Sequence, residues 1–376
     1  MYFKGEAEVG TIVDNDDLDM IKNEILKFQD PQYNHHEVIE AFEETFAEKI
    51  GCNYSLAISS CAVGIDMVLK SLKLTPDDEV ISCAINFHGT HLAILNTGAK
   101  LVLVEANDNL TICVDDLRCK INSRTKAIVI THMNGISCDM DAIDELVLGK
   151  NIKIIEDAAR ALGSKYRGNI TGKRSWACVF SFQYKKTITT LGEGGMIVTY
   201  DKKLYDTLSE YRSFGLGGSW GTNYKMTSVQ AAMGLSQLNK LDMLINKRRE
   251  LAKHRTNFIK EEKLDLQCPL DNETYFNTYY LYTILLSDNW YKEKRDLLIQ
   301  NLDKRGIGCV IANTTTYITN KYIYYKCNKP QNLHSEKLGQ RILCLPIHPL
   351  MTAEENNYII QIFVEEYEKV RRKINE

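Results

Sequence analysis

This chain has three residues that together can carry out covalent chemistry on an amine. They follow two successive apolar runs. Asp157 ends the apolar run 154–157, and Ser181 and Lys186 follow the next run, ahead of a glycine-rich turn at residues 192–195. A carboxylate can hold the ring nitrogen of pyridoxal phosphate, a serine hydroxyl can bind its phosphate, and a lysine amine can form a Schiff base with its aldehyde. The pattern therefore predicts a pyridoxal-phosphate site.

Lys186 is the predicted nucleophile. It lies between an apolar strand candidate that ends at Phe182 and the glycine-rich turn, where a side chain can enter a pocket. A lysine that loses its solvent there has a lowered pKa and can act as nucleophile and then as proton carrier. Most lysines are solvated surface charges, and the neighbouring Lys185 fits that description better.

Asp157 has two interpretations. Residues 158–162 could continue as a helix, and the carboxylate would then cap the helix N-terminus. In the other interpretation the carboxylate keeps the ring nitrogen of the cofactor protonated, which makes the ring a stronger electron sink. The presence of Lys186 in the same pattern favours the second interpretation.

Alternating apolar runs and helical patterns supply the scaffold for these residues. Helices are predicted at residues 38–50, 63–72 and 140–148, and strands at residues 79–83, 100–104, 127–131 and 152–156. Continuous apolar strands are typical of a parallel sheet covered by helices on both faces. Such sheets bind ligands beyond the carboxyl ends of their strands, which places Asp157 in the site.

The last third of the chain predicts a smaller α+β unit. A long helix would lead into it, followed by a strand and two further helices, at residues 226–262, 279–286, 290–305 and 353–373 in that order. A chain of 376 residues usually forms more than one domain. We expect a large domain at residues 1–245 and a small C-terminal domain at residues 246–376.

The composition excludes several classes of protein. A net charge of −3 with scattered Lys and Arg gives no reason to expect binding to nucleic acid or to an acidic membrane. Eleven cysteines without a Cys-x-x-Cys pair indicate reduced thiols more than disulfides or a zinc site. Residues 1–10 are too polar for a signal peptide, and no apolar run approaches the roughly 20 residues that cross a bilayer. We therefore expect a cytoplasmic protein.

An ordered set of motifs resembles the DegT/DnrJ/EryC1/StrS family of aminotransferases. The motifs are Glu-Asp-Ala-Ala-Arg at 156–160, Ser-Phe-x-x-x-Lys at 181–186, Gly-Glu-Gly-Gly at 192–195, and Gly-Thr-Asn-Tyr-Lys-Met at 221–226 followed by Gln-Ala-Ala at 230–232. The resemblance runs from about residue 40 to the end of the small domain. It implies a fold-type I pyridoxal-phosphate enzyme of the α/β class, with a mixed, mostly parallel sheet in its large domain.

The resemblance also implies roles for individual residues. Lys186 would form the Schiff base, Asp157 would face the ring nitrogen, and Arg160 stands near the cofactor's hydroxyl, where glutamine is commoner. Phe87 matches the aromatic residue that stacks on the cofactor ring, although without the resemblance an aromatic residue at this place is more often part of the core. Asn223 matches an asparagine that reaches the phosphate across a dimer interface, which implies a homodimer with shared active sites.

The phosphate would bind at Ser181 and at the turn formed by Ser60, Cys61 and Ala62. The backbone N–H groups of this turn open a helix predicted to begin near Val63, and the N-terminus of a helix favours an anion. A simple N-cap role for Ser60 is compatible with this assignment. The nearby His88 and His91 have the spacing of a metal pair, but no third ligand motif accompanies them, so no metal site is predicted.

The chain departs from the family's pattern in regions that contact substrates. Residues 28–31 stand where relatives have Gly-Trp-x-Thr-x-Gly, Met133 and Asn134 replace Leu-Tyr, and residues 314–317 replace His-Leu-Gln. The resemblance implies transfer of an amino group from an amino acid, by analogy glutamate, to a keto sugar, most often a nucleotide-linked one, by a ping-pong mechanism. A small phosphorylated ketone such as dihydroxyacetone phosphate is the alternative acceptor.

Two alternatives lie outside this class. A sugar dehydratase of related fold would carry histidine in place of Lys186, so the lysine argues against it. The second alternative is a non-catalytic or regulatory protein that only binds the cofactor. No basic DNA-binding segment or added domain supports this alternative.

Overall fold

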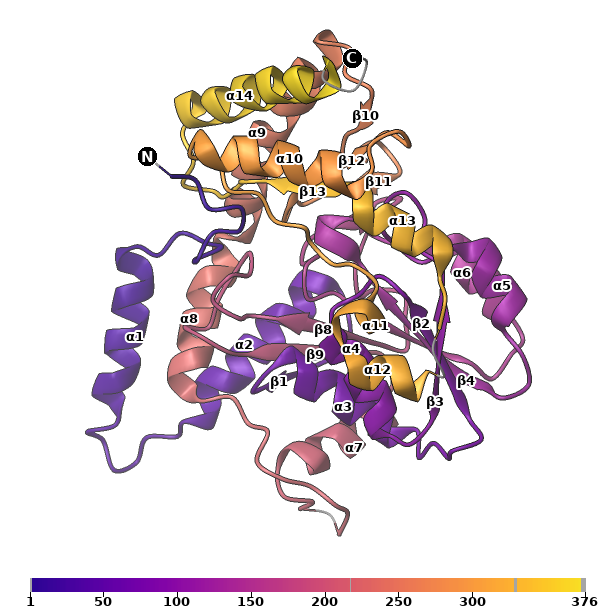
Figure 1. Cartoon of the computed structure of the whole chain (residues 1–376). Coiled ribbons are helices and arrows are strands. Elements are labelled where there is room, and N and C mark those ends of the chain that lie inside the picture. Colours follow the sequence, from indigo (N-terminus) through magenta and orange to yellow (C-terminus); the bar gives the residue numbers. More distant parts are fainter. Residues whose placement is uncertain (1, 217, 328–329, 373–376) are drawn as a thin grey trace.

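A computed structural model describes residues 2–216, 218–327 and 330–372 of the chain. The chain forms a large α/β unit around a seven-stranded sheet and a smaller unit around a three-stranded sheet (Figure 1). In the described part of the chain, no helix is both long and apolar enough to span a membrane. The expected boundary between residues 245 and 246 stays a prediction.

The central sheet is mixed and mostly parallel, as the sequence predicts. Its strands follow the order β1 (Tyr54–Ile58), β9 (Gly195–Thr199), β8 (Ala177–Ser181), β5 (Lys153–Asp157), β4 (Thr125–Thr131), β2 (Glu79–Cys83) and β3 (Lys100–Val104). Only β9 runs antiparallel to both of its neighbours, and the strands from β8 to β3 pair in parallel. The carboxyl ends of β4, β5 and β8 therefore meet at one edge, where Asp157 lies in register with Thr131 and Val179.

Helices cover both faces of this sheet. One face packs against α3 (Cys61–Ser71), α4 (His88–Asn96) and α7 (Lys202–Arg212). The other face packs against α2 (His36–Ile50), α5 (Val114–Lys120), α6 (Met140–Val147) and α8 (Ser228–Asn239). Apolar strands that are buried on both sides explain why the sequence shows continuous hydrophobic runs there without alternation.

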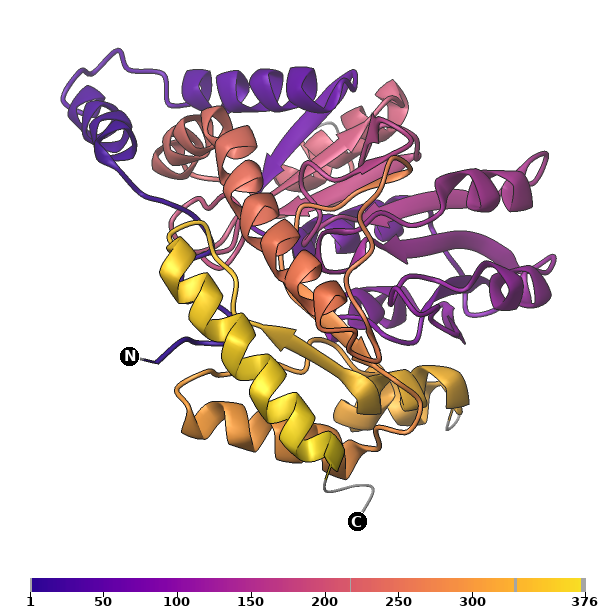
Figure 2. The ribbon, with the colours of Figure 1, turned by 90° about the horizontal axis from the view of Figure 1, so that it is seen from above.

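The smaller unit is an antiparallel sheet of β10 (Leu266–Gln267), β12 (Tyr282–Leu286) and β13 (Ile342–Leu345) with its own core. It is covered by α9 (Leu241–Glu261), α10 (Lys292–Lys304), α13 (Leu333–Arg341) and α14 (Ala353–Arg372), and in Figure 2 α9 runs from the large unit into the small one beside α14. Two short helices, α11 (Thr316–Thr319) and α12 (Lys321–Lys326), return to the large unit and add Tyr317 and Ile323 to its core.

The remaining elements lie around these two units. Helix α1 (Asn15–Lys27) lies beside α8, and the three short strands β6 (Lys165–Tyr166), β7 (Asn169–Ile170) and β11 (Tyr275–Phe276) form a separate sheet. A single-turn helix, η1 (Met133–Gly135), follows β4. The N-terminal Phe3 belongs to the core of the small unit, so the chain starts there and then crosses to the large unit.

One predicted element is wrong. The single helix expected at residues 226–262 is two helices, α8 and α9, that meet at Lys240. The amine of Lys240 binds Asp14 at 2.7 Å and Asp17 at 2.5 Å, contacts with the distant α1 region that no local sequence pattern encodes. The predicted end of the last helix at residue 373 lies outside the described residues.

Candidate active site

A cavity of about 370 Å³ lies at the carboxyl ends of β5 and β8, between the two units. It brings together eight of the nine residues that the sequence selects: Ser60, Cys61, Ala62, Phe87, Asp157, Arg160, Ser181 and Lys186. The ninth, Asn223, does not line the cavity of this chain and is exposed in the loop between α7 and α8.

Asp157 is the last residue of β5, and its carboxylate is buried and fixed. Oδ2 accepts a hydrogen bond from Thr90 Oγ1 at 2.6 Å, and Oδ1 accepts one from the backbone N–H of Ala159 at 3.1 Å. No helix follows, because the chain turns at residues 159–160, so the interpretation of Asp157 as a helix N-cap is wrong. The carboxylate therefore remains available to a ligand in the cavity.

Lys186 lies in the loop between β8 and β9. Burial away from water lowers the pKa of its amine to about 8, and the positive charge of Arg160 acts in the same direction. The negative charges of Asp157 and Glu6 oppose this shift only in part. Near neutral pH a much larger fraction of this amine is unprotonated than of an ordinary lysine, and the unprotonated form is the one that attacks a carbonyl carbon.

One end of the cavity is suited to a phosphate. Ser60 caps α3 and accepts a hydrogen bond from the N–H of Val63 at 3.3 Å, so the first N–H groups of the helix open toward the cavity. The helix begins at Cys61, two residues before the predicted start. A Cβ on Gly195 would lie 2.7 Å from Cys61 N, so a glycine is required for β9 to pass this close to the turn. Ser181 pairs with Gly195, and its hydroxyl therefore lies beside the same turn.

Phe87 and Arg160 line other walls of the cavity. Phe87 precedes α4, and its ring is 51% exposed. Arg160 donates a hydrogen bond from Nη1 to Asn134 Oδ1 at 2.9 Å. Asn134 in turn donates from Nδ2 to Thr283 Oγ1 at 3.0 Å, which ties the wall of the active site to strand β12 of the small unit.

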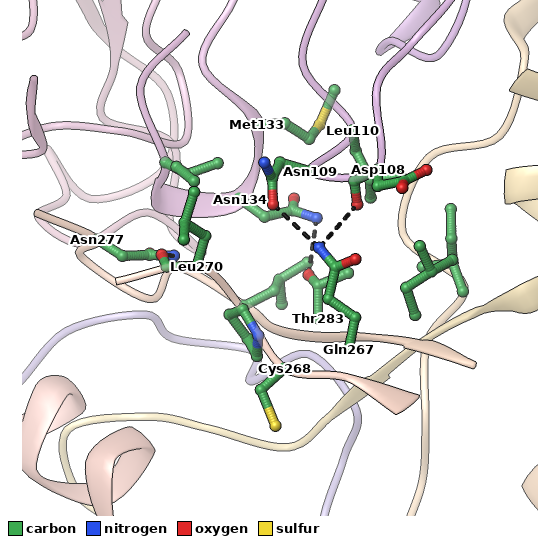
Figure 3. A pocket seen from close by; sticks show the side chains of 15 residues that line it. Asp108, Asn109, Leu110, Met133, Asn134, Gln267, Cys268, Leu270, Asn277 and Thr283 are labelled. Carbon is green, nitrogen blue, oxygen red and sulfur yellow. Dashed lines mark hydrogen bonds between the residues drawn. The ribbon is translucent and has the colours of Figure 1, made fainter. Parts of the chain in front are cut away.

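Asn134 also lines a second, much smaller cavity of about 30 Å³ (Figure 3). There, Gln267 donates to Asn109 Oδ1 at 3.1 Å and bridges the two units a second time. A cavity of this size has room for only about one or two water molecules, so it is a packing gap between the units and is too small for a substrate.

The structure adds residues to the cavity that the sequence motifs do not mark. These are Glu6, Asn86, Thr90, Lys185, Tyr280 and Asn313, among others. Glu6 and Tyr280 lie far from the motifs in the sequence, and only the packing of the small unit brings them to the site. Thr90 lies three residues after Phe87. The one sequence signal that could have selected it is its place after the end of a predicted strand, because parallel sheets bind ligands there.

The two histidines noted in the sequence do not act together. His88 is exposed, whereas His91 is buried and its Nδ1 lies 2.7 Å from Thr316 Oγ1. Among the residues that the structure describes, no group of three His, Cys, Asp or Glu side chains is arranged to hold a metal ion. The eleven cysteines are free thiols.

The donor set of the large cavity fits pyridoxal phosphate. Two serine hydroxyls and the N-terminus of a helix suit a phosphate dianion, and a fixed carboxylate suits a protonated ring nitrogen. A lysine with a lowered pKa suits an aldehyde. The residues present therefore match the phosphate, the ring nitrogen and the aldehyde of this cofactor.

Comparisons with known proteins agree with this chemistry. The sequence profile of the DegT/DnrJ/EryC1/StrS aminotransferase family matches residues 17–364. The chain is 34% identical over 337 residues to GDP-perosamine synthase of Escherichia coli O157:H7, covering 88% of this chain and 90% of that protein. It is 29% identical over 348 residues to the spore coat polysaccharide biosynthesis protein SpsC of Bacillus subtilis (strain 168), covering 86% and 88%.

A solved structure extends the comparison to the fold. PseC of Helicobacter pylori, an aminotransferase involved in the biosynthesis of pseudoaminic acid, superposes with a TM-score of 0.90 at 26% sequence identity. The match covers 97% of this chain and 100% of that one.

Proposed function

The chain belongs to the DegT/DnrJ/EryC1/StrS family and is a pyridoxal-phosphate-dependent aminotransferase, and from this premise we propose that it transfers the amino group of L-glutamate to a nucleotide-linked keto sugar. The observation that carries the proposal is the meeting of Lys186, Asp157 and the N-terminus of α3 in one cavity. The names of two relatives, GDP-perosamine synthase and PseC, support a sugar as the acceptor.

In this proposal the chain holds the cofactor at three points. The N–H groups at the start of α3, with the hydroxyls of Ser60 and Ser181, would bind the phosphate. Asp157, oriented by Thr90, would keep the ring nitrogen protonated. Phe87, the residue that precedes α4, would contact the ring of the cofactor. When bound, the cofactor supplies an aldehyde that captures amines and a ring that accepts an electron pair.

Lys186 is the proton carrier of both half-reactions. Its amine has a pKa of about 8, so it can accept a proton from the α-carbon of the bound glutamate and can return one near neutral pH. In the second half-reaction the same amine returns a proton to the carbon of the acceptor that becomes aminated. Because glutamate and acceptor use one site in turn, ping-pong kinetics are expected.

Asn223 and the oligomeric state complete the proposal. Asn223 is exposed and lies outside the cavity of its own chain, as a residue that acts on a second subunit would. We propose that the enzyme is a homodimer in which Asn223 of each subunit contacts the phosphate in the partner's site.

The proposal is tested by following 2-oxoglutarate release from L-glutamate. Purified holoenzyme is offered a panel of nucleotide-linked keto sugars and, separately, small phosphorylated ketones. We expect release with at least one keto sugar and none with the Lys186→Ala variant. If only phosphorylated ketones cause release, the acceptor is a small phosphorylated ketone and not a keto sugar.

A further inference from the structure

The N-terminal segment, residues 3–10, is anchored at both of its ends. In the small unit, the N–H of Phe3 donates to Gly306 O at 2.8 Å, and Phe3 O accepts from the N–H of Gly308 at 2.7 Å. At the other end, Gly10 O accepts a 2.7 Å hydrogen bond from Arg248, a buried residue of α9. A segment that is fixed at both ends holds the residues between them in place.

This segment passes directly over the loop that carries the active-site lysine. The N–H of Gly10 donates to Tyr184 O at 3.2 Å. A Cβ at Gly10 would lie 2.0 Å from Lys185 O, so a side chain at this position would force the segment away from the loop. The close approach therefore depends on glycine and brings Glu6 into the cavity.

Glu6 contacts one residue from each unit. Its Oε1 accepts a 2.6 Å hydrogen bond from the hydroxyl of Tyr280, and its Oε2 lies 3.5 Å from the amine of Lys185. Burial opposes ionisation of Glu6, but the hydrogen bond from Tyr280 and the positive charge of Arg160 lower its pKa overall. The side chains of Glu6 and Lys185 remain 24% and 26% exposed, so both can reach a ligand.

This carboxylate and ammonium suit the neutral, hydroxylated ring of a sugar. A carboxylate accepts hydrogen bonds from hydroxyl groups, and an ammonium donates hydrogen bonds to them. The exposed rings of Phe87 and Tyr184 add apolar surface to the same cavity. A phosphorylated small ketone would bring its negative charge toward Glu6, whereas the ring of a sugar has hydroxyls for both members of the pair.

We propose that Glu6 and Lys185 are specificity-determining residues that bind hydroxyl groups on the sugar ring of the acceptor. This inference rests on the proposed function. Glu6 belongs to the N-terminal segment, so acceptor choice depends on a part of the chain that lies outside the motifs of the cofactor site. Tyr280 fixes the carboxylate and leaves one oxygen of Glu6 directed to Lys185 and the ligand.

The test separates the two half-reactions of the holoenzyme. Absorbance of the cofactor is followed first with L-glutamate alone and then, after the amine is loaded, with the keto-sugar acceptor. In Glu6→Gln and in Lys185→Gln, we expect the half-saturating concentration of acceptor to rise about tenfold or more, as for loss of a charge-assisted hydrogen bond. The half-reaction with glutamate should change much less.

Two variants of the same segment serve as matched controls. Glu8 and Lys4 pair with each other at 3.0 Å, and their side chains are 58% and 59% exposed. Glu8→Gln and Lys4→Gln make the same changes of charge outside the cavity, and the acceptor concentration dependence should stay at the wild-type value. Wild type should bind an acceptor that lacks the contacted ring hydroxyl more weakly than the complete acceptor. In Glu6→Gln, the absence of this hydroxyl should cause no further loss of affinity.

The outcomes distinguish this inference from the proposed function. Wild-type turnover of a keto sugar with unchanged acceptor dependence in both variants would overturn the inference and leave the function standing. Equal losses in both half-reactions would also overturn it, because Glu6 would then act on Lys186 and not on the acceptor. If wild type aminates no keto sugar, both proposals fail together.

Discussion

Thr90 Oγ1 donates a 2.6 Å hydrogen bond to Asp157 Oδ2, and both side chains are buried. The other carboxylate oxygen already accepts from the N–H of Ala159, so each oxygen of Asp157 has a donor. Thr90 lies in the first turn of α4, three residues after Phe87. One helix start therefore provides both a ring for the wall of the cavity and the donor that fixes the carboxylate.

Replacing Thr90 by valine should weaken the hold on the cofactor. The substitution keeps the shape of the side chain but leaves a buried carboxylate oxygen without its donor, which costs about 1–3 kcal/mol. We expect the dissociation constant for pyridoxal phosphate to rise about tenfold, measured by titrating apoprotein, and Thr90→Ser to restore it. Thr199→Val removes a buried hydroxyl that donates to Trp176 O and accepts from the N–H of Asp201 outside the cavity, and this variant should bind the cofactor normally. Normal binding by Thr90→Val would contradict this role.

The lowered pKa of Lys186 predicts how cofactor capture depends on pH. Below a pKa of about 8 most of the amine is protonated and cannot attack an aldehyde, so the rate of capture should rise with pH and level off above about 8. Stopped-flow mixing of apoprotein with pyridoxal phosphate measures this rate. A rate that continues to rise toward pH 10 would show an amine with an ordinary pKa.

Arg160 should tune this pKa. Its positive charge lowers the pKa of Lys186, so Arg160→Gln should move the midpoint of the capture profile to higher pH. Arg174 provides the control, because its guanidinium pairs with Asp141 and Asp144 away from the cavity. Arg174→Gln should leave the midpoint in place, and an unchanged midpoint in Arg160→Gln would contradict the electrostatic argument.

The strands of the central sheet are predictable from sequence for a physical reason. Strands such as β2 and β3 are short, largely apolar runs, and the observed bounds of both equal the predicted ones. The break between α8 and α9 at Lys240 could not be predicted, because it coincides with ion pairs to Asp14 and Asp17 that exist only after folding. Local patterns encode burial, but they do not encode which distant groups meet.

The candidate site divides in the same way. Asp157 and Lys186 follow strand ends in a recognisable order, so the sequence alone selects them. Glu6 and Tyr280 have no such signal, because the N-terminal segment and the small unit are brought to the cavity by tertiary packing. A helix after Asp157 is the less favoured of two interpretations of the sequence, and the structure has a turn there in which the carboxylate accepts a hydrogen bond from the N–H of Ala159.

The buried pair of His132 and Glu156 predicts a large loss of stability on mutation. His132 Nε2 lies 2.6 Å from Glu156 Oε2, and His132 Nδ1 accepts a hydrogen bond from the N–H of Cys138. In His132→Ala, Glu156 keeps only part of its hydrogen bonding in the core, and we expect the free energy of unfolding to fall by about 3 kcal/mol. Urea denaturation measures this loss. The same substitution at His334, which is half exposed, should cost under about 0.5 kcal/mol.

Subunit complementation tests whether Asn223 acts across a dimer interface. Lys186→Ala and Asn223→Ala homodimers should both be strongly impaired, since each lacks one required group in both sites. In a mixed dimer, one site combines the intact Lys186 of the Asn223→Ala chain with the intact Asn223 of the Lys186→Ala chain. Mixing and reassembling the two inactive proteins should therefore recover activity from one site per mixed dimer, measured as 2-oxoglutarate release.

A residue that acts within its own subunit gives the opposite result. If Asn223 served the site of its own chain, each site of the mixed dimer would still lack a group, and mixing would restore nothing. The exposed position of Asn223, outside the cavity that holds Lys186, favours recovery. Mixing Lys186→Ala with Asp157→Asn is the matched control, because both residues line the same cavity of one chain and no combination of these subunits rebuilds a complete site.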